Sequence, residues 1–125
     1  MIAVLVGLFG LAGALGRFGV DSWFVAHPPT RRHWPWATLV VNAVGCIVIG
    51  LAAGLARADW FGDTWHTALA TGFAGGLTTF SSWTSATVRL LEERRYLGAA
   101  GNVVANLALG LALAAGGLAV GTALA

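Results

Sequence analysis

The chain has 125 residues, of which 58% are hydrophobic and only 10% are charged, and its formal net charge is +2. A soluble globular domain carries about 25% charged residues, so this composition excludes an ordinary water-soluble domain and places the chain in a lipid bilayer. All seven basic residues are arginines that stand singly or in pairs, so there is no basic stripe and we predict no nucleic-acid partner.

Four apolar runs are long enough to cross a bilayer, which takes about 20 residues. They span about residues 2–25, 36–56, 65–91 and 96–124. The connections between them are short and polar, and five of the six tryptophans lie at run ends, where an amphipathic ring prefers to sit. We therefore predict an all-α membrane protein, with a single four-helix transmembrane domain over residues 1–125.

The first run carries two charged residues near its end, Arg17 and Asp21. Their spacing of four residues allows an ion pair across one helical turn. Alternatively, the Arg17 guanidinium lies at the mouth of an anion path. The sequence leaves both interpretations open.

Asparagines interrupt the second and fourth runs. Asn42 lies in the second, and Asn102 and Asn106 are four apart on one face of the fourth. Polar groups at membrane depth are costly, so their default interpretation is functional. These neutral amides predict either a hydrogen-bonded seam between helices or the lining of a water-accessible path. No carboxylate lies in the middle of a run, so there is no proton-coupling site and no charged cation site.

The third run is the most polar, and its glycines and β-branched threonines predict a helix broken near Gly75–Thr79. Broken helix inside a membrane is tolerated only where protein or a cavity surrounds it, and freed carbonyl groups at such breaks coordinate cations. Beyond the break, Phe80 and Trp83 share one helical face. Their ring edges carry partial positive charge that attracts a small anion, although an aromatic pair at this spacing also serves packing alone.

The arginines predict an orientation. The first and third connections lie on one side of the membrane and hold Arg31, Arg32, Arg94 and Arg95, whereas the second connection holds only Arg57. By the positive-inside rule, both termini face outward.

Each of the first three runs contains a short motif. The third run contains Gly75-Gly76-Leu77-Thr78-Thr79-Phe80-Ser81, the second contains Asn42 and Gly45, and the first contains Gly10, Gly13, Ala14 and Arg17. In this order they resemble the GGxTTFS, VNxxG and GxxGAxxR segments of the Fluc (CrcB) family of fluoride channels. The resemblance covers almost the whole chain.

The resemblance implies an antiparallel, dual-topology dimer in the cell membrane that exports fluoride passively through two pores. It also implies a structural sodium ion at the dimer centre, held by the main-chain carbonyls of Gly75 and Thr78. The unequal numbers of arginines on the two sides of the membrane leave two dimer partners open. The partner is either a second copy of this chain, which we favour, or a paralogue with the opposite arginine distribution.

Fluoride is small and strongly hydrated, so its pore must replace water with hydrogen-bond donors and ring edges. The residues assigned to the pore are Asn42, Phe80, Ser81, Ser82, Trp83, Asn102 and Asn106, with Arg17 in the vestibule. The sequence departs from the family at three of them. The family usually has phenylalanine at the position of Trp83, and commonly tyrosine and serine at those of Asn102 and Asn106.

Two other functions compete with a fluoride channel. A small multidrug exporter is also a four-span antiparallel dimer, but its mechanism needs a membrane-embedded carboxylate in the first span, where this chain has only Asp21 near the end. A non-transporting scaffold would use the glycines and asparagines for packing alone. We predict no enzymatic activity, because no nucleophile, base and orienting group occur together.

Overall fold

The computed structural model describes residues 1–29, 33–57, 59–60 and 62–125, and these contain helices but no strand. Three long helices are α1 (Ile2–Ala26), α2 (Trp36–Arg57) and α6 (Tyr96–Ala123). Each is long and apolar enough to cross a membrane, with mean hydropathies of 1.8, 2.3 and 2.1 over its most apolar stretch. Arg31 and Arg32, on which part of the predicted orientation rests, lie outside the described residues.

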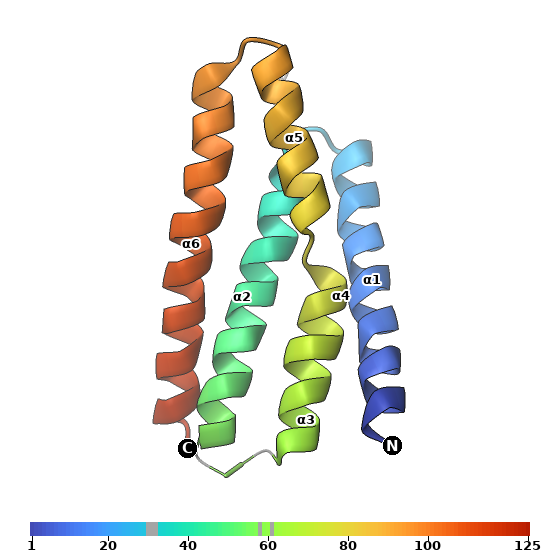
Figure 1. Ribbon diagram of the computed structural model, residues 1–125, viewed down its shortest axis with the longest axis vertical. Helices are drawn as coiled ribbons and strands as arrows, with labels where there is room; N and C mark the ends of the chain where they lie inside the picture. The colour runs from blue at the N-terminus through green and yellow to red at the C-terminus, as the bar shows by residue number, and fades with distance from the viewer. Residues whose placement is uncertain (30–32, 58, 61) are drawn as a thin grey trace.

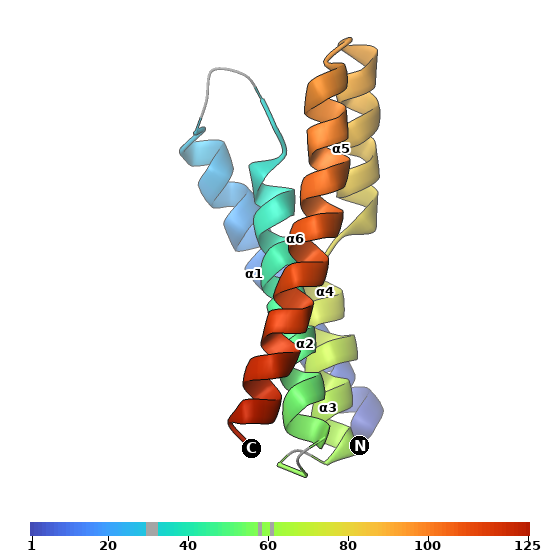
Figure 2. The same ribbon diagram turned by 90° about the vertical axis from the view of Figure 1, so that its left-hand side faces the viewer.

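The chain between α2 and α6 forms a composite helical segment. It starts as α3 (Asp63–Thr67), continues as the π-helical η1 (Ala68–Ala74) and the short α4 (Gly75–Leu77), and resumes after an interruption as α5 (Phe80–Glu92). The segment before the interruption packs against α1, and α5 packs against α6 (Figure 1). In the view of Figure 2, the upper ends of α1 and α5 diverge. The composite segment therefore changes its neighbour at the interruption, from α1 before it to α6 after it.

The interruption is narrower than the sequence predicts. Gly75 and Gly76 are helical, and only Thr78 (φ −77°, ψ 158°) and Thr79 (φ −147°, ψ 120°) are extended. The helix persists through the glycines because α1 lies directly against it: a Cβ atom at Gly76 would overlap the carbonyl oxygen of Gly10. This close backbone packing offsets the low helix propensity of glycine. The π-helical stretch ahead of the glycines was not predicted.

Glycines allow the closest helix contacts in two places. Gly13 of α1 lies against η1 and α4, where a Cβ atom would overlap the carbonyl oxygen of Phe73 and lie 2.8 Å from the amide nitrogen of Leu77. Between α2 and α6, Cβ atoms at Gly54 and Gly121 would lie 2.6 Å and 2.7 Å from main-chain carbonyl oxygens of the facing helix. Real Cβ atoms do not approach so closely, so glycine is required for the observed helix spacing.

We expect Gly13→Ala to destabilise the fold by about 1–3 kcal/mol, the usual cost of overpacking. Gly7 is the matched control on the same helix, because a Cβ atom there meets nothing within 4 Å. Gly7→Ala should leave stability unchanged or raise it by up to about 1 kcal/mol through helix propensity. Thermal unfolding in detergent measures both, and equal melting temperatures would contradict the packing assigned to Gly13.

Candidate functional site

The extended peptide at Thr79 is held by a side chain from a different helix. The Thr79 amide donates to Asn42 Oδ1 at 2.9 Å, and Asn42 Nδ2 donates to the Thr79 carbonyl at 3.3 Å. Asn42 lies on α2, so one amide side chain replaces both the donor and the acceptor that a continuous helix would supply. This bidentate contact supplies a partner for both main-chain groups of Thr79.

The same interruption leaves two carbonyl groups without their helical donors. Thr79 N, which would bond the Gly75 carbonyl in an α-helix, is used by Asn42. Ser82 N, which would bond the Thr78 carbonyl, instead bonds Thr79 Oγ1 at 3.2 Å and caps α5. Within the described part of the chain, neither carbonyl accepts a main-chain hydrogen bond. Oxygen ligands of this kind suit a hard cation, so the predicted pair of donors, Gly75 and Thr78, fits a sodium ion chemically.

Arg17 reaches the interruption from α1. Its Nη1 lies 3.5 Å from the Thr78 carbonyl oxygen, a long contact with part-buried groups. In the described ranges the one ion pair joins Arg95 and Glu93, also at 3.5 Å. The alternative of an Arg17–Asp21 pair is therefore not found, and the guanidinium places positive charge next to the broken helix.

The three asparagines lie together in one network. Asn42 Nδ2 donates to Asn106 Oδ1 at 3.0 Å, and Asn106 Nδ2 donates to Asn102 Oδ1 and O at 3.1 Å and 2.9 Å. Asn102 is completely buried and donates through Nδ2 to Thr87 Oγ1 at 2.9 Å and to the Trp83 carbonyl at 3.4 Å. Within this single chain, the amides form the hydrogen-bonded seam that the sequence left as one of two interpretations.

The aromatic pair lies at the start of α5. Phe80 and Trp83 meet edge to face, with ring centroids 5.4 Å apart and planes at 73°. The Trp83 indole donates to the Asn102 carbonyl at 3.2 Å and is half-buried, whereas Phe80 is 72% exposed. Ser81 and Ser82 are also exposed. The first turn of α5 therefore presents an exposed phenyl ring and two exposed serine side chains.

Two further residues of this region were missed by the sequence-based prediction. Thr79 supplies the N-cap of α5 through its hydroxyl and the main-chain groups that Asn42 binds. Thr87 accepts the Asn102 amide. A threonine directly before the first residue of a helix is a recognisable N-cap signal, whereas nothing in the sequence identifies the partner of Thr87.

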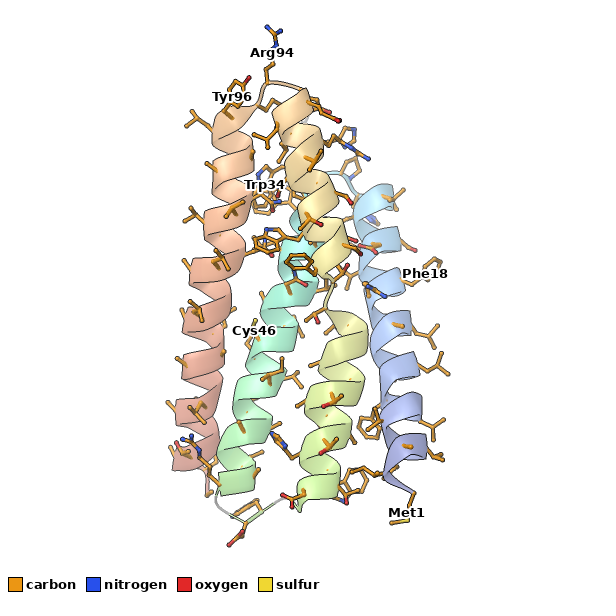
Figure 3. All side chains as sticks on the ribbon, in the orientation of Figure 1. Met1, Phe18, Trp34, Cys46, Arg94 and Tyr96 are labelled. Carbon is orange, nitrogen blue, oxygen red and sulfur yellow. The ribbon has the colours of Figure 1, made fainter. Side chains whose placement is uncertain are left out.

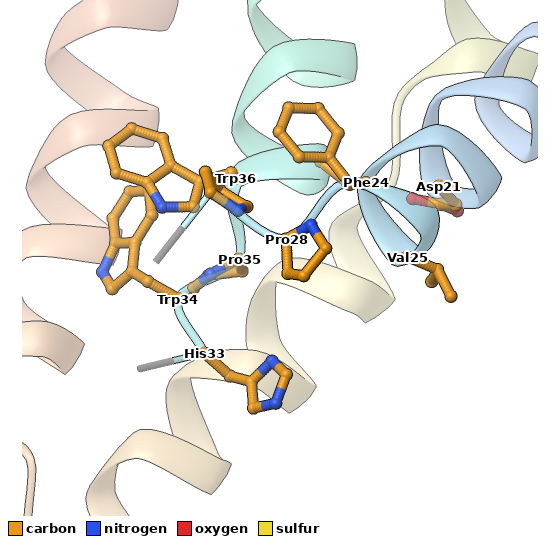
Figure 4. A pocket seen from close by; sticks show the side chains of 10 residues that line it. Asp21, Phe24, Val25, Pro28, His33, Trp34, Pro35 and Trp36 are labelled. Carbon is orange, nitrogen blue, oxygen red and sulfur yellow. The ribbon is translucent and has the colours of Figure 1, made fainter. Parts of the chain in front are cut away.

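A cavity of about 420 Å³ lies away from this region, between the C-terminal end of α1 and the start of α2 (Figure 4). Its lining is mostly apolar and aromatic and is made by Asp21, Phe24, Val25, Pro28, Pro29, His33, Trp34, Pro35, Trp36 and Ala37. It contains none of the residues predicted for the pore, so the cavity does not mark the candidate site.

Comparison with known proteins gives consistent matches over most of the chain. Residues 4–118 match the model of the family described as CrcB-like protein, Camphor Resistance (CrcB). A fluoride-specific ion channel FluC of Renibacterium salmoninarum is 47% identical, over 91% of this chain and 94% of the relative. FluC channels of Bordetella petrii and Thermococcus kodakarensis are 40% and 36% identical, over 98% and 90% of this chain and 91% and 89% of the relatives.

Proposed function

Because this chain belongs to the CrcB-like family, we propose that it is a fluoride-specific ion channel of the cell membrane. It is a multi-pass membrane protein and not an enzyme. The observation that carries the proposal is the exposed Phe80 ring at the start of α5, set edge to face with Trp83 beside two exposed serines. Ring edges and hydroxyl hydrogens are neutral groups with outward partial positive charge, which suits a small anion.

Neutral donors explain how an anion could be bound and still released. A buried cation facing fluoride would hold it too tightly, whereas conduction requires binding that is favourable enough for entry and weak enough for exit. The nearby positive charge, Arg17, is directed at the Thr78 carbonyl. It lies at the interruption, where it would attract anions without being their final ligand.

The composite segment from Asp63 to Glu92 would form the third crossing beside α1, α2 and α6. Its interruption lies among neighbouring helices, where Asn42 binds both main-chain groups of Thr79 and Arg17 contacts the Thr78 carbonyl. Irregular backbone at membrane depth is tolerated under these conditions. The four crossings then form one transmembrane domain, through which fluoride would leave the cell passively, down its own gradient.

An antiparallel dimer would complete the site. Gly75 is exposed, and a Cβ atom there meets nothing within 4 Å, so this glycine lies on an uncovered surface of the chain. Each chain contributes two carbonyl groups, those of Gly75 and Thr78. A second copy related by a twofold axis would place its pair opposite the pair of the first chain. Four oxygen ligands would hold a structural sodium ion between the chains.

The direct test is efflux from proteoliposomes made with this chain alone. We expect fluoride to be released and chloride retained, because the donors suit a small, strongly hydrated anion. Empty liposomes give the baseline. Equal efflux of both ions, or none of either, would contradict a fluoride channel made by this chain. If the chain is silent alone but active with an oppositely biased family member, the heterodimer replaces the homodimer.

A further inference from the structure

The cavity at the C-terminal end of α1 has one formally charged group in its lining, the carboxylate of Asp21. Figure 4 shows Asp21 and Phe24 on the α1 side of this cavity, and Trp34 and Trp36 on the side of α2. Its volume of about 420 Å³ lies within the range of small-ligand sites, about 300–1,000 Å³. A carboxylate beside aromatic rings suits a cationic ligand, because the faces of such rings attract ammonium groups.

Asp21 lies on the face of α1 that is turned toward the lipid. Phe18, Asp21 and Val25 are spaced by three and four residues, so they share one side of the helix. Both apolar members are exposed, and the Phe18 side chain points away from the other helices (Figure 3). A carboxylate on such a face of a membrane helix is costly unless it has a partner. We therefore expect a cationic partner for Asp21.

The described part of the chain offers Asp21 no counter-ion. The one ion pair found there joins Arg95 and Glu93, and the guanidinium of Arg17 is directed at the Thr78 carbonyl. The surrounding lipid can supply the missing cation. A helix of 25 residues, such as α1, is longer than the hydrocarbon core of about 30 Å, so its ends reach the headgroup region. The cavity lies at one of these ends.

The aromatic side of the cavity is fixed within the chain. The Trp34 indole donates to the Gly98 carbonyl of α6 at 3.2 Å, and its ring centroid lies 4.6 Å from that of Trp36. Three of the lining residues are prolines, which restrict the backbone, so little conformational entropy is lost when a ligand binds. In the described ranges, the indoles with a protein acceptor are those of Trp34 and Trp83. The N–H of Trp36 is therefore available to a ligand.

We propose that this cavity binds the headgroup of phosphatidylethanolamine from the surrounding membrane. Its ammonium group pairs with the Asp21 carboxylate and contacts the aromatic rings, and its phosphate accepts the indole N–H of Trp36. An acyl chain then follows the exposed face of α1 past Phe18. An anionic lipid without an ammonium group fits less well, because the charge in the lining is negative. Binding here does not depend on the proposed channel function.

The first test is native mass spectrometry of the full-length protein in detergent, titrated with phosphatidylethanolamine or with phosphatidylglycerol of identical acyl chains. We expect phosphatidylethanolamine to bind about 3-fold to 30-fold more tightly, the combined effect of one exposed ion pair and one cation–π contact. Asp21→Asn keeps the size of the side chain and removes its charge, so it should abolish the preference. Glu92→Gln, an exposed carboxylate on α5, is the matched control and should retain the preference.

Two results would overturn the lipid site. One is equal binding of the two lipids by the wild-type protein, and the other is an unchanged preference in Asp21→Asn. The melting temperature of each variant without added lipid shows whether it is folded. Trp36→Phe tests the phosphate contact, because it keeps an aromatic ring and removes the N–H group. It should weaken binding of both lipids by a similar factor, and selective loss of phosphatidylethanolamine would contradict the assigned orientation of the headgroup.

A competition experiment separates a lipid from a soluble amine. Phosphoethanolamine carries the same charged groups without acyl chains, and at a concentration equal to that of the lipid it should leave the bound lipid in place. Displacement of the lipid would identify a soluble amine as the occupant and would overturn the lipid site. These outcomes are distinct from failure of the proposed function, because a protein that conducts no fluoride but prefers phosphatidylethanolamine rejects the channel and supports this site.

Discussion

Phe80→Ile should abolish fluoride efflux from proteoliposomes while leaving the helical fold intact. The ring is 72% exposed, so little buried surface depends on it and isoleucine retains most of its bulk. What the substitution removes is the positive ring edge, and loss of one well-placed group at a polar site costs on the order of 100-fold in rate. Efflux is measured with a fluoride electrode, and folding by circular dichroism.

Phe18 provides the matched control for this experiment. It is 70% exposed on α1, and its side chain points away from the other helices (Figure 3). Phe18→Ile removes the same ring at similar exposure, and we expect normal flux from it. If Phe80→Ile conducts like the Phe18 variant, the aromatic pair serves packing and the anion passes elsewhere.

Gly75→Leu should prevent assembly and flux without unfolding the single chain. Within the chain a Cβ atom at this position meets nothing within 4 Å, so the larger side chain has room. In the proposed dimer, the same side chain would stand between the carbonyl oxygens and their shared sodium ion. Light scattering in detergent should show this variant as a monomer, while its helix content stays the same as that of the wild-type protein.

The control is Gly19→Leu, because Gly19 is also open in the single chain but lies on a different helix, α1. It should remain dimeric. For the wild-type protein, replacing sodium with a large organic cation should lower the dimer fraction. The proposed central site would be excluded if Gly75→Leu still forms a dimer and if the dimer fraction of the wild-type protein does not change when sodium is replaced.

The first and last residues of the long helices could be predicted closely from the sequence. Prolines and charged residues end the apolar runs and leave few other positions for the helix ends. The runs placed at 2–25 and 36–56 correspond to helices Ile2–Ala26 and Trp36–Arg57. The interruption was placed less well, because propensity alone assigns it to the glycines. The contact of Gly76 with Gly10 of α1 keeps those residues helical, and only tertiary packing reveals that contact.

The hydrogen-bond partners of the polar residues could not be predicted from spacing. The four-residue interval of Asn102 and Asn106 places them on one face of a helix, but it does not say whether that face meets water or protein. The answer depends on Asn42, 60 or more residues away in the sequence, and on Thr87, whose hydroxyl completes the set. The Arg17–Asp21 spacing was equally ambiguous, and the guanidinium bonds a main-chain carbonyl instead.

The pairing of α2 with α6 has a consequence for biogenesis. Their contact is the most extensive between any two helices described, and it depends on Gly50, Gly54, Gly117 and Gly121. Because α6 is synthesised well after α2, α2 must wait in the bilayer with this glycine-lined face covered only by lipid while the intervening segment is inserted. The nascent protein thus acquires its tightest contact only after α6 has followed, and a ribosome that stops before Gly117 releases a chain in which α2 lacks this partner.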